Sequence, residues 1–103
     1  MEETPRYKLE SKHVAMVQDL KRLHSKQHAE MQDAITKDYA DQTKTDEELS
    51  AWLIKDAELD KRQALQLATL REKHAHEREE LELKERHKQE MLELQEKQKH
   101  NIN

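Results

Sequence analysis

Apolar residues recur along this chain at the spacing of helices that bury one face and expose the other. Thr4-Pro5 fits the cap and first residue of a helix, and the pattern then continues to Ala40. It resumes after Thr45, which has Glu48 three residues later, as is typical of a capping box. The pattern therefore predicts one helix within residues 1–40 (about 5–40) and a second within 46–103 (about 46–100).

Residues 41–45 form a polar stretch that favours a turn or hinge between the two helices. A continuous helix is the alternative, because Met31 and Leu59 are separated by whole heptads and no Gly or Pro forces a break. We expect an all-α, elongated coiled coil of long helices, with a helical hairpin broken near 41–45 as the favoured form. The pattern stops midway at the chain end, so we expect a piece of a longer protein.

The most regular feature is an eleven-residue repeat of large apolar residues. Leu9, Leu20 and Met31 are spaced by eleven, and the same spacing continues from Leu59 to Leu92. Eleven residues in three turns favour a nearly straight or gently right-handed hendecad seam over a left-handed heptad coil. We expect the following residues to form the helix–helix interface: Leu9, Met16, Leu20, Leu23, Met31, Ile35, Leu49, Trp52, Leu59, Leu67, Leu70, Leu81, Met91 and Leu92.

A second apolar stripe lies off this seam. Leu83 and Leu94 fall nearly opposite Leu81 and Leu92, and Leu53 points away from the main row. A two-stranded coil would leave such residues in water, so we interpret Leu53, Leu83 and Leu94 as a stripe that binds a partner.

Composition narrows the class of protein. Charged residues make up 41% of the chain and hydrophobic ones 33%, with no Gly and no Cys, which is too little apolar surface for a globular core. Neither arm is strongly basic, which argues against nucleic acid as a partner. No apolar run is long enough for a membrane span or a signal peptide. The lack of Cys agrees with an intracellular, cytoplasmic protein.

Seven histidines raise the questions of metal binding and pH sensing. His24 and His28 are one helical turn apart, but two ligands are too few for a structural zinc site, so we expect no metal and no other cofactor. His13, His24 and His74 lie on the expected seam, where protonation would bring like charges together. The hypothesis is that assembly weakens between about pH 7 and pH 5.5.

Catalysis has no support in the sequence, since there is no phosphate-binding loop and no recognisable nucleophile. The leading hypothesis is a non-enzymatic module that oligomerises and acts as a scaffold, as a homodimer or higher homo-oligomer, with another helical protein as a further partner. The recurring Leu-x-x-Lys-His-like units resemble the hydrophilic helical tails of phospholipase C-β enzymes, a likeness of composition and repeat. Two alternatives remain: the tail of a signalling enzyme that contacts a membrane surface, and a charged-helix spacer.

Overall fold

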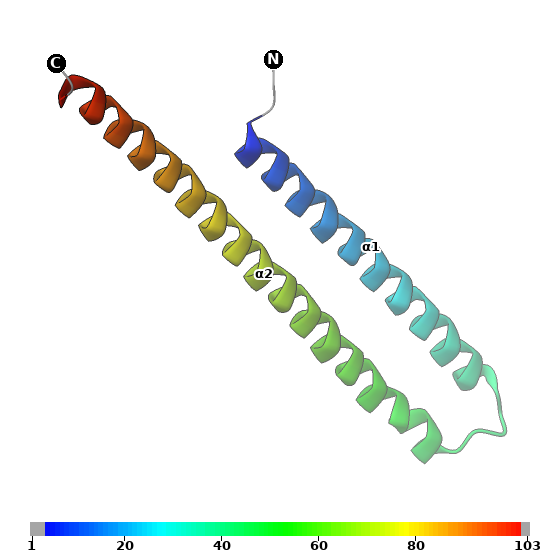
Figure 1. Ribbon diagram of the computed structural model, residues 1–103. Coiled ribbons are helices and arrows are strands. Elements are labelled where there is room, and N and C mark those ends of the chain that lie inside the picture. Colours follow the sequence, from blue (N-terminus) through cyan, green and yellow to red (C-terminus); the bar gives the residue numbers. More distant parts are fainter. Residues whose placement is uncertain (1–3, 102–103) are drawn as a thin grey trace.

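The chain folds into two long helices that lie side by side in opposite directions and are joined by a short turn (Figure 1). The computed structural model describes residues 4–101, and of His100 and Asn101 the backbone alone. Helix α1 spans Pro5–Ala40 and helix α2 spans Asp46–Asn101. The Cα atoms extend over 92 × 28 × 8 Å. The predicted fold class, an all-α elongated hairpin of coiled-coil type broken near 41–45, is confirmed.

Local hydrogen bonds fix where each helix begins. The Thr4 hydroxyl oxygen accepts the Tyr7 backbone N–H at 3.1 Å, and Pro5 follows as the first helical residue. At α2 the Thr45 hydroxyl oxygen accepts the Glu48 N–H at 3.2 Å, and three acidic residues occupy the first turn. These are the caps that the sequence predicts.

The turn after α1 is held by Asp41. Its backbone is extended, with φ −84° and ψ 110°, and its Oδ1 accepts the Thr43 hydroxyl at 2.7 Å and the Thr43 N–H at 2.9 Å. These two hydrogen bonds, the hydroxyl first, hold the pKa of Asp41 below its usual range. A short polar side chain that bonds the backbone two residues later is a standard turn device, so the break needs neither Gly nor Pro.

The covered residues of α1 fit both a heptad and a hendecad spacing, so the hendecad seam stays a prediction. One row of them recurs alternately three and four apart, as in a heptad. Another row, which begins Leu9, His13, Met16 and Leu20, is spaced four, three and four apart, which sums to eleven. In α2 the covered residues Leu59, Gln63, Leu67 and Leu70 are spaced four, four and three positions apart. Two successive steps of four do not occur in a heptad repeat, and the three steps together make eleven residues. The buried and half-buried residues of α1 are Leu9, Glu10, His13, Met16, Val17, Leu20, His24, Gln27, His28, Met31, Ala34, Ile35 and Asp38.

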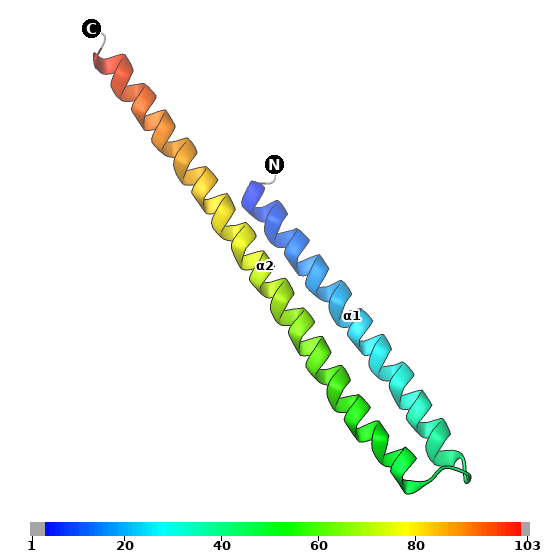
Figure 2. The same cartoon turned by 60° about the horizontal axis from the view of Figure 1, so that its bottom comes forward.

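Helix α2 is much longer than α1, and its C-terminal part projects beyond the N-terminal end of α1 (Figures 1 and 2). Arg6 and Glu85 still lie around one small cavity at that end. Residues 86–99 are exposed throughout, including Met91, Leu92 and Leu94. In the described part of the chain, neither helix has an apolar stretch that could cross a membrane.

Candidate functional site

The most enclosed polar group of the hairpin is a pair of histidines from opposite helices. His13 of α1 and His74 of α2 stack with ring centroids 3.7 Å apart and planes inclined by 8°. His13 is 2% exposed and His74 3%. The Nε2 of His13 lies 3.2 Å from the Oε2 of Glu77, one helical turn beyond His74. Two residues 61 positions apart in the sequence, both expected on the seam, therefore form one contact.

The environment of His74 favours an uncharged ring. Burial, and then the nearby His13, lower the pKa of His74, because a charged imidazole loses its hydration and would face a second positive ring. The hydrogen bond with His13 lowers the pKa of Glu77, which keeps that carboxylate ionised. In the described part of the molecule, Nδ1 of His13 and Nε2 of His74 are buried without a hydrogen-bond partner. Such atoms each cost about 1–3 kcal/mol, so the pair is held at the expense of stability.

His24 belongs to a second polar layer of the seam. Its Nε2 lies 3.0 Å from the Oε1 of Gln66, and Gln63 donates from Nε2 to the backbone oxygen of His24 at 3.2 Å and to the Oε1 of Gln27 at 3.0 Å. Gln63 is 7% exposed. A buried amide that is satisfied only when the helices are in register penalises a sliding of one helix along the other. Sequence reasoning missed Gln27, Gln63 and Glu77 because it sought apolar seam residues.

A hydrogen bond next to the turn joins the end of α1 to the start of α2. The Trp52 indole N–H donates to the Oδ2 of Asp38 at 2.7 Å, and the Lys55 ammonium lies 4.7 Å from the centre of the Trp52 ring. Trp52 was expected on the seam, and it is partly covered there. Because a buried indole N–H needs a hydrogen-bond acceptor, the carboxylate of Asp38 lies opposite Trp52 across the seam.

Removing this acid gives a direct measure of the link. Asp38→Ala is expected to lower the free energy of unfolding by about 1 kcal/mol, because a partly buried indole N–H loses its acceptor. Urea titration followed by circular dichroism measures the change. The matched control is Asp33→Ala, an exposed acid on the same helix, which should change stability by less than about 0.5 kcal/mol. Equal losses for both variants would contradict a specific role of the bond.

The residues expected in the helix–helix interface fall into two groups. Most of them lie between α1 and α2 and are buried or half-buried, with Leu59 the most enclosed at 6% exposed. Leu23, Met91 and Leu92 are 47%, 45% and 54% exposed and lie outside that contact. The residues of the expected second stripe, Leu53, Leu83 and Leu94, are all at least half exposed.

An apolar groove of about 690 Å³ opens along one face where the two helices meet. The sequence pattern did not single out Leu65 or Thr69, which help to line it. Leu65 is 68% exposed, as is typical of a residue whose packing partner lies elsewhere. Asp19 of α1 and Lys73 of α2 stand at its rim. The lining residues are Met16, Asp19, Leu20, Leu23, Leu65, Gln66, Thr69, Leu70 and Lys73.

Comparison of the chain with protein-family models, with curated proteins and with solved structures finds no match. The seam and the groove between the two helices are therefore the features from which we infer a function.

Proposed function

We propose that this chain is a non-enzymatic coiled-coil module that self-associates and thereby brings together the proteins or protein segments attached to it. The observation that carries the proposal is the apolar groove between Leu23 and Leu65, whose side chains are 47% and 68% exposed. The occupant that we assign to the groove is a second copy of the chain. The absence of Cys supports a cytoplasmic setting for the module.

Weak burial within one hairpin supports association. Leu59 is the sole hydrophobic residue in the described part of the chain that is buried, while large side chains such as Leu53 and Leu65 remain largely in water. A single helix pair with so narrow a core gains little hydrophobic stabilisation to offset the entropy of ordering the chain. Burying the groove residues against another hairpin adds the missing apolar contact, as in a four-helix bundle.

The charges beside the groove support a second copy as the occupant. One rim residue, Asp19 on α1, is acidic and another, Lys73 on α2, is basic. In a dimer with twofold symmetry, the same patch of both copies forms the interface, so an acid of one copy can meet a base of the other. A surface that carries an acidic and a basic residue in this way can therefore pair with the same surface of a second copy. A partner surface that is mainly acidic or mainly basic would attract only one of these two residues and repel the other.

The test is the mass of the intact chain in solution. Sedimentation equilibrium over a concentration series is expected to give a dimer or higher oligomer for the unchanged protein. The variant Leu23→Glu/Leu65→Glu places two charges in the groove and is expected to weaken association at least about 100-fold, because the charges cannot be buried unpaired. Circular dichroism should show that its helices persist.

Leu53→Glu is the matched control, since Leu53 is 72% exposed and lies outside the groove. It is expected to associate as the unchanged chain does. Loss of association in Leu53→Glu alone would move the interface to the second stripe and overturn the assignment to the groove. A helical monomer at all concentrations that sediments with anionic liposomes would favour the membrane-surface alternative.

A further inference from the structure

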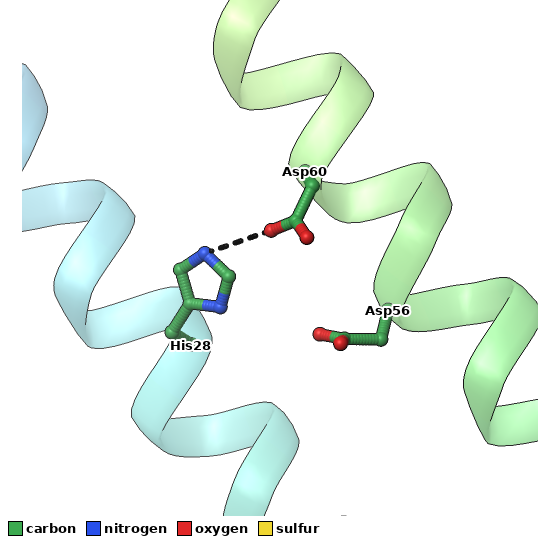
Figure 3. A group of neighbouring side chains, drawn as sticks. All are labelled: His28, Asp56 and Asp60. Carbon is green, nitrogen blue, oxygen red and sulfur yellow. Dashed lines mark ion pairs between the residues drawn. The ribbon is translucent and has the colours of Figure 1, made fainter.

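Three side chains with metal-binding atoms meet across the two helices close to the turn (Figure 3). His28 comes from α1, and Asp56 and Asp60 come from successive turns of α2. One ligand atom from each residue lies within 4.8 Å of those from the other two. The Nε2 of His28 is 3.2 Å from the Oδ1 of Asp60.

The placement of Asp56 has no explanation in helix packing alone. It occupies a half-buried seam position between Trp52 and Leu59, where an apolar side chain would stabilise the hairpin. Asp60 carries a like charge one turn away on the same helix, and such pairs destabilise a helix. Figure 3 shows the carboxyl groups of both acids directed toward the imidazole of His28. A cation held among the three groups relieves the repulsion between the acids.

We infer that His28, Asp56 and Asp60 form a binding site for a divalent transition-metal ion of the zinc class. One imidazole and two carboxylates are a ligand set that zinc accepts, and water can take the fourth position because the site faces solvent. The side chains of His28 and Asp60 are 40% and 60% exposed, so they can rotate to bring their ligand atoms to the spacing of about 3.5 Å that tetrahedral coordination requires. Calcium, which takes six to eight oxygen ligands, fits this set poorly.

A metal at this place would fasten α1 to α2 near the turn. Its ligands come from both helices and meet only in the folded hairpin, so binding stabilises the folded state over the unfolded chain. The inference does not depend on the self-association proposed above, because all three ligands belong to one chain and none of them lines the apolar groove.

The experiment is thermal unfolding of the intact chain followed by circular dichroism, in EDTA and with increasing Zn²⁺, together with calorimetric titration of Zn²⁺. Zn²⁺ is expected to raise the melting temperature of the unchanged chain. His28→Gln, Asp56→Asn and Asp60→Asn should each weaken Zn²⁺ binding at least about tenfold, because each removes one ligand without altering side-chain size greatly. Their spectra in EDTA establish that the variants still fold.

His76→Gln is the matched control, since His76 is exposed and its nearest acid, Glu79, is on the same helix. It should keep the full response to Zn²⁺. The inference is overturned if Zn²⁺ does not raise the melting temperature, if the three ligand variants respond as the unchanged chain does, or if Ca²⁺ has the same effect at equal concentration.

Discussion

Leu59→Ala is expected to lower the free energy of unfolding of the hairpin by about 2–5 kcal/mol, the range for a Leu cut back to Ala in a packed core. Leu59 is 6% exposed and is the buried hydrophobic residue of the described part of the chain. The loss has two parts. The removed methyl groups no longer contribute the free energy of their transfer out of water, and the cavity that remains costs further packing energy. Because small folds are stable by only about 5–15 kcal/mol, this one change removes a large share of the total.

Urea unfolding at a low, fixed chain concentration measures this loss without adding the effect of association. Leu53→Ala is the matched control, because it deletes the same atoms from a side chain that is 72% exposed. Its effect should stay within about 0.5 kcal/mol. Similar losses in the two variants would mean that Leu59 is not enclosed as the hairpin requires. Leu70→Ala and Leu81→Ala, at half-buried positions, should fall between these limits.

Acidification is expected to destabilise the hairpin through His74, which is buried against His13. The pKa of His74 in the folded chain lies below the ordinary value of 6.5, so the unfolded chain takes up the proton first. Stability is therefore independent of this group well above pH 6.5 and falls as the pH drops below that value, until the folded chain is protonated too. The pKa of Glu77 is also lowered, and its contribution is lost at still lower pH as that carboxylate takes up a proton.

Other charges near the pair act in both directions. Arg78 and Lys73 lower the pKa of His74 further, whereas Glu77 raises it. A charged His74 is disfavoured because its ring is buried and stacked on the His13 ring, with 3.7 Å between the ring centroids. The melting temperature should therefore fall as the pH drops below 6.5, and the association of the chain should weaken over the same range.

The double variant His13→Leu/His74→Leu isolates this effect. It is expected to raise the free energy of unfolding at pH 7.5 by about 1–3 kcal/mol, since two buried nitrogen atoms without partners are replaced by apolar groups. Its melting temperature should vary much less between pH 7 and pH 5.5. The control is His76→Leu, at an exposed position, which should keep the pH profile of the unchanged chain. Coincident profiles for the double variant and the unchanged chain would refute the role of the pair.

The sequence by itself indicated where each helix begins, and it favoured a break at 41–45. Thr4-Pro5 and Thr45 are capping signals that act within one turn, and the hydrogen bonds of Asp41 with Thr43 join residues two positions apart. Such interactions depend on neighbours in the chain, so residue types and their order are enough to predict them. The absence of a large apolar core likewise follows from composition alone.

The tertiary structure alone decided which seam residues meet. An apolar spacing of eleven places residues on one face of each helix but does not say which of them meet across the hairpin. Contact between the His13 and His74 rings, or between His28 and the acids of α2, depends on the antiparallel register of residues far apart in the sequence. Each helix would tolerate several registers, and the choice arises from the summed packing of the seam and its polar layers, which no local pattern encodes.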